Sequence, residues 1–182
     1  MKILVLHLSL LFLSFSINAK QVFLGPSNNS QEEIQEALID LEPGDILTLK
    51  PGEYFFEDGL SLDIDDVIFE GSGIDETILN FENQMSGAQG LLVTSNGVTI
   101  RDFAVLDAKG DAIKVIGADG IKMIRLRTEW TGGPKETNGA YGFYPVESKD
   151  VLIDGCVAIG ASDAGIYAVS YTHLRAHETR IH

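Results

Sequence analysis

Three residues at matching places in successive sequence repeats carry related chemistry. Lys114, Tyr144 and Tyr167 lie in short alternating segments, in which side chains point in turn to opposite faces. Tyrosine rings stack on the C–H faces of sugar rings, and polar neighbours can hydrogen-bond sugar hydroxyls. The residues two places earlier are small and predict the floor of a groove: Ala112, Gly142 and Gly165. Polar residues expected at the edge of this groove are Asp111, Tyr141 and Asp163.

The same face has a plain structural interpretation. A solvated outer surface can also carry tyrosines that pack along a stack and aspartates that form turns. Asp163, within Ser162-Asp163-Ala164-Gly165, fits turn formation better than catalysis, whereas Asp111, which follows Gly110, fits both. A carboxylate with a basic residue within hydrogen-bond reach would favour a catalytic role, and packed aromatic residues alone would favour a binding or structural role.

These positions are defined by a repeat between Gly90 and Ala168. Val98, Ile121 and Val151 begin matching strands, 23 and 30 residues apart, each after a cluster of Gly, Asp, Asn, Ala, Ser or Lys. Repeats of this length with a period of two predict short strands that coil into a solenoid. Three columns of inward residues are expected: Val98, Ile121 and Val151; Ile100, Met123 and Ile153; Phe103, Leu126 and Cys156.

The first residues have the pattern of an export signal. Lys2 precedes a nearly continuous apolar run from Ile3 to Phe15, and Ala19 ends a usable cleavage site. A bilayer span needs roughly 20 apolar residues, and this run is shorter. We therefore predict a signal peptide over residues 1–19, a secreted or periplasmic location, and no membrane span in the mature chain.

A helix is expected after the signal. Ser30 and Glu33 have the spacing of a capping box, Ile34 and Leu38 lie on one helical face, and Pro43-Gly44 marks the end. The open end of a solenoid exposes apolar surface and unpaired strand edges. The helix is therefore predicted to cap the first coil.

A longer coil between Arg127 and Ala140 holds the single tryptophan, Trp130, together with Lys135 and Asn138. Loops on rigid scaffolds often carry function, so these three residues are candidates for substrate binding. Trp130 can equally fold over an apolar patch of the coil. Both interpretations remain open on the sequence.

The last residues break the strand rhythm. His173 and His177, followed by Glu178, have the spacing of a metal site on a helix. The repeat stops in mid-coil, however, and the segment resembles tails on unrelated predicted proteins that arise from adaptor DNA. We predict an incomplete solenoid domain over residues 20–168, a non-native tail over residues 169–182, and no metal site.

Several functional classes are excluded or disfavoured. The formal net charge of −14 argues against nucleic-acid binding, and mildly against a polyanionic substrate unless a cation such as Ca²⁺ bridges the like charges. The sequence shows no Ser/His/Asp set, because its histidines lie in the signal peptide and the tail. Cys156 falls in an inward column and is assigned to the core.

The repeat resembles the right-handed parallel β-helix of the pectate-lyase-like superfamily, and within it a group of secreted bacterial β-helix repeat proteins. The similarity extends over residues 31–168. The segments that carry it are Asp107–Val115, Trp130–Pro134, Asn138–Val146 and Gly160–Tyr167. The implied fold is an all-β, right-handed, single-stranded parallel β-helix with a short N-terminal capping helix.

The resemblance also implies a function. Proteins of the superfamily bind extended polysaccharides along a strand face, and some are lyases, epimerases or hydrolases. By this analogy Lys114 or Tyr144 is a candidate for proton abstraction, and Asp111 or Asp163 for acid catalysis or cation binding. We expect a lyase- or epimerase-like protein that acts on a polysaccharide and is a monomer when full length; calcium is a cofactor that the resemblance allows. The alternative is a non-catalytic solenoid that binds glycans or another protein.

Overall fold

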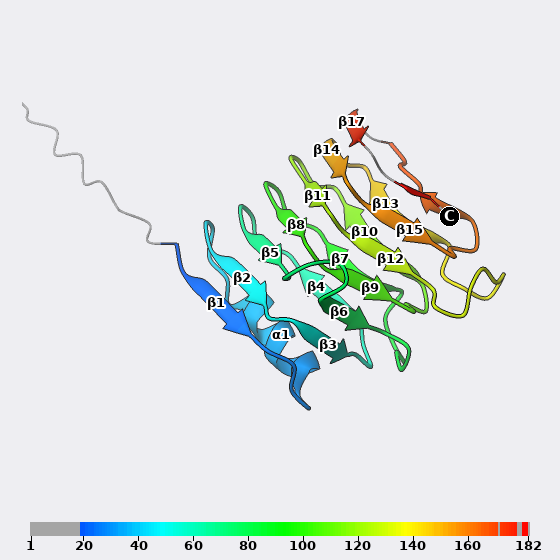
Figure 1. Ribbon diagram of the computed structural model, residues 1–182. Helices are drawn as coiled ribbons and strands as arrows, with labels where there is room; N and C mark the ends of the chain where they lie inside the picture. Colours follow the sequence, from blue (N-terminus) through cyan, green and yellow to red (C-terminus); the bar gives the residue numbers. More distant parts are fainter. Residues whose placement is uncertain (1–18, 171, 178–179, 182) are drawn as a thin grey trace, which may run out of the picture.

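Short parallel strands stack coil upon coil in the computed structural model, which describes residues 19–170, 172–177 and 180–181 (Figure 1). The predicted signal peptide lies outside the described residues except for Ala19, so this prediction stands untested. Within the described part of the chain, no helix is long and apolar enough to cross a membrane.

Three parallel sheets form the sides of the solenoid, and each complete coil gives one strand to each sheet. The seven-stranded sheet consists, in order, of β1 (Gln21–Leu24), β2 (Ile46–Leu49), β5 (Ile68–Glu70), β8 (Thr99–Arg101), β11 (Lys122–Ile124), β14 (Lys149–Asp154) and β17 (Thr172–His177). The five-stranded sheet consists of β4 (Leu60–Leu62), β7 (Gln89–Val93), β10 (Asp111–Ile116), β13 (Tyr141–Val146) and β16 (Ala164–Ile166). The six-stranded sheet consists of β3 (Gly52–Phe55), β6 (Thr77–Asn80), β9 (Ala104–Leu106), β12 (Arg127–Glu129), β15 (Val157–Ile159) and β18 (Arg180–Ile181). This is the right-handed parallel β-helix that the sequence predicts.

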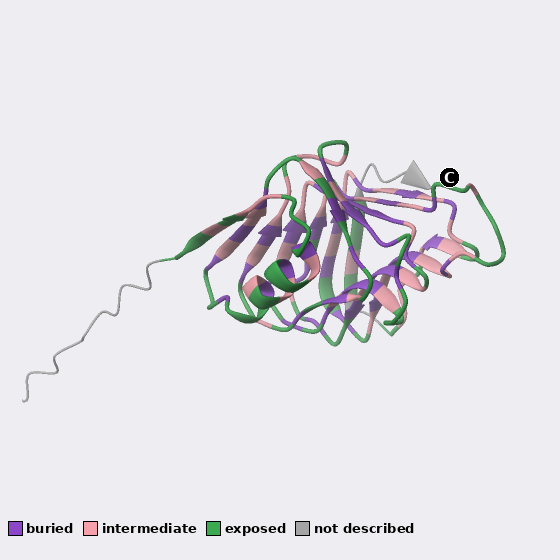
Figure 2. Cartoon of the chain, turned by 90° about the horizontal axis from the view of Figure 1, so that it is seen from below, coloured by how far each residue is buried: buried purple, intermediate pink, exposed green. Residues whose placement is uncertain are grey.

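The inward columns have the predicted composition. Ile100 pairs with Met123, and Met123 pairs with Ile153, in the registers β8–β11 and β11–β14. All nine predicted column residues have an exposed fraction of 1% or less. Buried residues recur along successive strands (Figure 2), and those of all three sheets belong to one apolar cluster, so the stacked coils form a continuous core.

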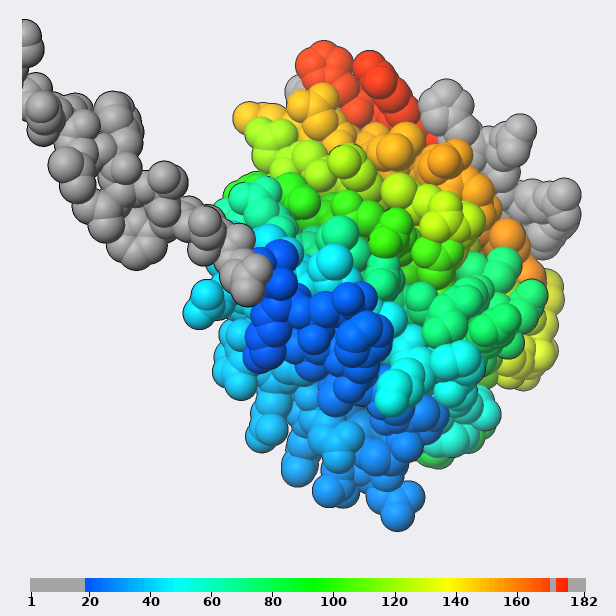
Figure 3. All heavy atoms as spheres, turned by 60° about the vertical axis from the view of Figure 1, so that its left-hand side comes forward, coloured from blue at the N-terminus to red at the C-terminus, as the bar shows by residue number. Residues whose placement is uncertain are grey.

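Helix α1 (Ser30–Ile39) closes one end of the stack. Ile34 and Leu38 are buried against the first coils, and the opposite side of the helix is exposed (Figure 2). In the space-filling view the blue residues, the first that the structure describes, lie in front of successive coloured bands that are the following coils (Figure 3). The helix therefore covers the apolar end of the solenoid, as the sequence predicts.

The predicted capping box is wrong in its details. The N-cap residue is Asn29, which makes no side-chain capping bond, and Ser30 is the first helical residue. The Ser30 hydroxyl donates to the carbonyl oxygen of Ser27 at 2.9 Å, and the Ser27 hydroxyl donates to Glu33 Oε2 at 2.9 Å. The spacing indicated a helix start correctly, but Ser30 and Glu33 bond to the preceding turn rather than to each other.

The last described residues continue the coil. Leu174 of β17 pairs with Val151 of β14, and Ala176 of β17 pairs with Ile153 of β14. Residues 172–177 are therefore a strand, and the helix that a paired-histidine metal motif would require does not form. The statement that residues 169–182 form a non-native tail stays a prediction.

Candidate functional site

The candidate site lies on the outer face of the five-stranded sheet, on strands β10, β13 and β16. Lys114 pairs directly with Tyr144, and Tyr141 pairs with Ala164. The amide of Tyr167, just after β16, donates to the carbonyl oxygen of Phe143 at 2.9 Å, which continues the register. The predicted ladder of Lys114, Tyr144 and Tyr167 is thus formed across three coils.

A repeated kink at the start of these strands brings more residues to the outer face. Ala112 and Ile113 are both buried, although neighbours on a regular strand point to opposite faces. Because two successive residues point inward, Asp111 and Lys114 both face outward. The same double burial at positions 142 and 143 places Tyr141 and Tyr144 on one face.

The predicted groove floor of small residues is wrong. Ala112, Gly142 and Gly165 are buried rather than exposed on the outer face. A Cβ atom added to Gly142 would meet the Thr128 hydroxyl and the Gly165 carbonyl oxygen, each at 2.6 Å. These residues are small because the chain turns a corner there and passes close to the six-stranded sheet.

Asp111 and Lys114 form a loose ion pair, with 3.7 Å between Lys114 Nζ and Asp111 Oδ2. Burial raises the pKa of the Asp111 carboxyl, and the charge of Lys114 and the Tyr141 amide offset part of this shift. Lys114 Nζ also lies over the Tyr144 ring, 4.8 Å from its centroid. The structure therefore brings together Asp111, Lys114 and Tyr144, the three residues that the sequence selected for catalysis.

Three tyrosines form a cluster beside this trio. The ring centroids of Tyr141 and Tyr167 are 4.6 Å apart, those of Tyr141 and Tyr144 are 4.5 Å apart, and those of Tyr144 and Tyr167 are 5.6 Å apart. Tyr167 is 42% exposed and offers the most accessible ring. Partial burial is the main cause that raises the pKa of Tyr141, and the neighbouring carboxylate of Asp163 raises it further. Asp163 itself is exposed in the turn before β16, where its amide donates to the Ala140 carbonyl oxygen.

Trp130, Lys135 and Asn138 lie in the segment between β12 and β13, at the corner between the six-stranded and five-stranded sheets. Trp130 is only 4% exposed, and its indole N–H donates to the Ala108 carbonyl oxygen at 2.7 Å. Trp130 is therefore packed over the coil, which is one of the two interpretations that the sequence left open. The Asn138 amide donates to the carbonyl oxygens of Gly133 and Gly160, so it holds the loop in place. All three residues line a cavity of about 320 Å³.

The same cavity is lined by residues that the sequence analysis did not select, among them Asp107 and Lys109. They precede β10 as the Trp130–Asn138 loop precedes β13, so they occupy the same corner one coil earlier. Alignment of the two corners in the repeat was the signal that could have identified them.

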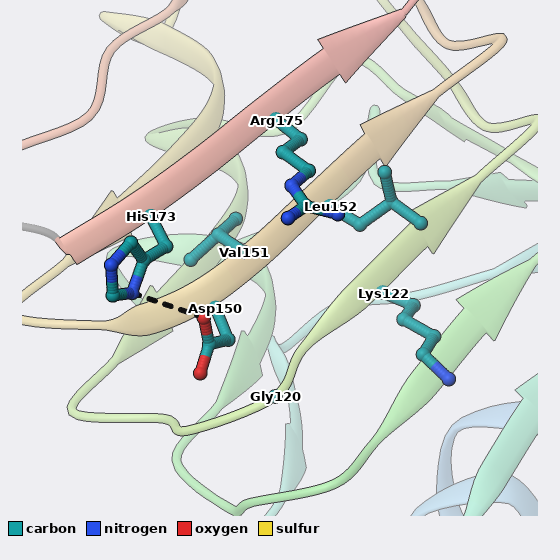
Figure 4. A pocket seen from close by; sticks show the side chains of 7 residues that line it. All are labelled: Gly120, Lys122, Asp150, Val151, Leu152, His173 and Arg175. Carbon is teal, nitrogen blue, oxygen red and sulfur yellow. Dashed lines mark ion pairs between the residues drawn. The ribbon is translucent and has the colours of Figure 1, made fainter.

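A second cavity, of about 290 Å³, lies on the outer face of the seven-stranded sheet (Figure 4). Its lining includes Asp150 of β14 and His173 of β17, whose Oδ1 and Nδ1 atoms are 3.3 Å apart. Two of the residues that line it, His173 and Arg175, belong to the segment that is predicted to be non-native.

The described residues contain no group of three or more His, Cys, Asp or Glu side chains placed to hold a metal ion. Asp111 is the carboxylate in contact with Lys114, and Asp163 is in the turn on the far side of Tyr141. This set does not fit the six to eight oxygen ligands that Ca²⁺ prefers.

Comparisons with known proteins identify the fold. No protein-family model matches the chain, and no curated protein sequence matches it. An alginate lyase from Paenibacillus sp. str. FPU-7 superposes with a TM-score of 0.66 and 16% identity, covering 90% of this chain and 58% of that one. The catalytic domain of a GH87 alpha-1,3-glucanase, in complex with tetrasaccharides, gives a TM-score of 0.60 and 17% identity, covering 92% of this chain and 37% of that one.

The chain therefore spans less than two thirds of the length of either structure. At these identities the similarity shows the fold. The chain has a parallel β-helix fold, and the fold that the sequence resemblance implied is confirmed.

Proposed function

We propose that the protein acts on a polysaccharide as a lyase or epimerase, with its reactive groups on the outer face of the five-stranded sheet. The observation that carries the proposal is the position of Lys114, between the Asp111 carboxylate and the Tyr144 ring. The fold similarity to an alginate lyase and a glucanase supports a carbohydrate substrate, although it reaches only the fold.

The chemistry begins with a C–H bond next to a carboxylate on the sugar ring. Lys114 or Tyr144 removes this proton as the general base, and the ammonium of Lys114 stabilises the negative charge that develops on the carboxylate when Tyr144 is the base. A lyase then breaks the bond to the leaving oxygen, which takes a proton from an acid and leaves an unsaturated sugar. An epimerase returns a proton to the opposite face of the carbon. Asp111, whose carboxyl lies 3.7 Å from Lys114 Nζ and whose pKa is raised by burial, is the candidate for this acid.

The test incubates purified protein with uronic-acid and neutral polysaccharides, in calcium or in chelator, and follows the absorbance of unsaturated products. A rise establishes a lyase, and sugar inversion seen by NMR without such a rise establishes an epimerase. Because the chain spans only part of its structural neighbours, the same assay is run on a form extended beyond residue 168. If both forms leave every polysaccharide unchanged, the catalytic proposal is wrong.

Lys114→Arg separates the two candidate bases. Arginine stays protonated in proteins, so it can stabilise charge but cannot accept a proton. Retained activity in this variant would assign the base to Tyr144, and lost activity would assign it to Lys114. Tyr144→Phe is the reciprocal variant.

A second function is favoured by the tyrosine cluster, whose exposed Tyr167 ring could stack on a sugar without any reaction. Such a non-catalytic solenoid would bind a polysaccharide in calorimetry and leave it chemically unchanged. Under either function, export through residues 1–19 is part of the proposal. Mass spectrometry of the mature protein should show Lys20 as its first residue, and an intact Met1 would contradict export by cleavage.

A further inference from the structure

A polar cavity lies at the corner where the six-stranded sheet meets the five-stranded sheet. Turn segments of three successive coils line it, at Glu82, at residues 107–109 and in the loop after β12. Its volume is about 320 Å³. Lys109 stands two residues before Asp111, in the bend that leads into β10, so the cavity adjoins the proposed reactive groups.

The walls of this cavity are held by hydrogen bonds between coils. The Trp130 indole N–H donates to Ala108, and the Asn138 amide donates to both Gly133 and Gly160. Gly139 approaches the coil below so closely that a Cβ atom there would collide with the carbonyl oxygen of Gly110. A ligand would therefore meet a preformed site and lose little energy in ordering it.

Two lysines in the cavity have free donors. Lys109 Nζ donates to the backbone carbonyl of Glu82 at 3.0 Å, which leaves two of its three donors. Among the described residues, no carboxylate lies within ion-pair distance of Lys109 Nζ or Lys135 Nζ. The ammonium groups are therefore available to an anion.

Two acidic residues also line the cavity. Both oxygens of Asp107 accept hydrogen bonds from Thr131, at 2.8 Å from its amide and 2.6 Å from its hydroxyl. Asp107 is thus committed to fixing the loop. Glu82 is exposed and offers its backbone oxygen, not its carboxylate, to Lys109. The acidic groups therefore leave both lysines free to bind a ligand.

We propose that this cavity is a subsite for a uronic acid residue, whose carboxylate is bound by Lys109 and Lys135. The inference rests on the proposed function, because it places a neighbouring sugar of the same polysaccharide beside the Asp111–Lys114–Tyr144 trio. It also names the substrate class: an acidic polysaccharide binds locally to a chain whose net charge is −14. The net charge alone argued mildly against a polyanionic substrate.

Calorimetry with short oligouronates tests the subsite in the parent and in Lys109→Gln/Lys135→Gln. Loss of two charge-assisted hydrogen bonds should weaken oligouronate binding about tenfold or more and reduce its salt dependence. Binding of neutral oligosaccharides should not change. Lys149→Gln, an exposed lysine on β14, is the matched control and should bind like the parent.

The outcomes separate this inference from the proposed function. If the parent and the double variant bind oligouronates equally, the subsite is wrong and the proposed function stands. If the parent binds no oligosaccharide, the proposed function fails and the subsite fails with it. A sulfated oligosaccharide is a further probe: an equal loss of its binding in the double variant would show a general anion site and overturn the assignment to uronate.

Discussion

The outer faces of the seven-stranded and five-stranded sheets use charge in different ways. At the edge of the seven-stranded sheet, Arg125 bonds both oxygens of Asp102, at 2.6 and 2.7 Å, and Arg101 bonds Glu70 of the coil below through two nitrogens. On the five-stranded sheet, Asp111 and Lys114 are 3.7 Å apart.

The difference distinguishes groups that join coils from groups that are available for reaction. A carboxylate that accepts two guanidinium hydrogen bonds has little capacity left for a substrate. Asp111 is desolvated, its pKa is raised, and its lysine partner lies at longer range. Chemistry is therefore expected on the face that carries the loosely paired Asp111 and Lys114, and stabilisation at the Arg125–Asp102 and Arg101–Glu70 pairs.

The largest expected effect is on activity. Lys114→Ala/Tyr144→Phe removes both candidate bases and should lower kcat/KM by about 10²- to 10⁴-fold. Polysaccharide turnover measures it, and Lys122→Ala, on the outer face of the seven-stranded sheet, is the control with unchanged activity. Full activity in the double variant would remove these residues from the mechanism.

The paired face should respond in stability instead. Glu70→Gln weakens the bond to Arg101 and to the Thr48 hydroxyl, and should lower the free energy of unfolding by about 1–2 kcal/mol, as read from urea denaturation. Catalysis should not change. Asp75→Asn is the matched control, because the side chain of Asp75 is 80% exposed and its pair with Arg127 should contribute almost nothing. A loss of activity in Glu70→Gln with intact folding would break the distinction between the two faces.

Tyr167→Ala tests binding on the reactive face. Loss of one exposed stacking surface should weaken glycan binding by about 1 kcal/mol, or roughly fivefold. If the ring only binds substrate, KM rises and kcat is unchanged. A fall in kcat at constant KM would instead place Tyr167 in the chemical step.

The smallest effect is the pH dependence of stability at Asp111. Burial raises the pKa of the Asp111 carboxyl in the folded protein above 3.8. Its favourable contribution to the free energy of unfolding is therefore present below pH 3.8 and is lost as the pH rises through the folded pKa. Asp111→Asn should therefore melt slightly higher than the parent at pH 7, with the difference vanishing below the ordinary aspartate pKa. A variant that melts lower at pH 7 would show that the Lys114 pair outweighs the desolvation of Asp111.

Period-two alternation predicted a solenoid of short strands and its inward columns, because stacking repeats each apolar position from coil to coil. The right-handed parallel β-helix was implied by the family resemblance. Asp111, Lys114 and Tyr144 lie close together in the structure, and their roles stay predictions. The inward turn of Ala112 and Gly142 was missed, since alternation does not reveal where a chain rounds a corner. That corner decides which side chains share a face, and it explains why Asp111 contacts Lys114 three residues away.

The environment of Trp130 could not be predicted for a related reason. Its burial depends on the Ala108 carbonyl of the preceding coil, 22 residues earlier in the sequence. The capping prediction failed locally, because Ser30 and Glu33 had an alternative partner in Ser27. Motif spacing therefore indicated where elements begin, while neighbouring coils decided what each side chain contacts.

The parallel register also constrains how the protein folds. Paired strands are far apart in the chain: Ile46 pairs with Ile68, 22 residues later, and Leu60 pairs with Leu91, 31 residues later. A strand finds no partner until another coil is ordered, so loop-closure entropy must be overcome at every step. We expect slow folding by templating, in which an ordered coil, such as the one sealed by α1, presents the edge on which the next coil forms.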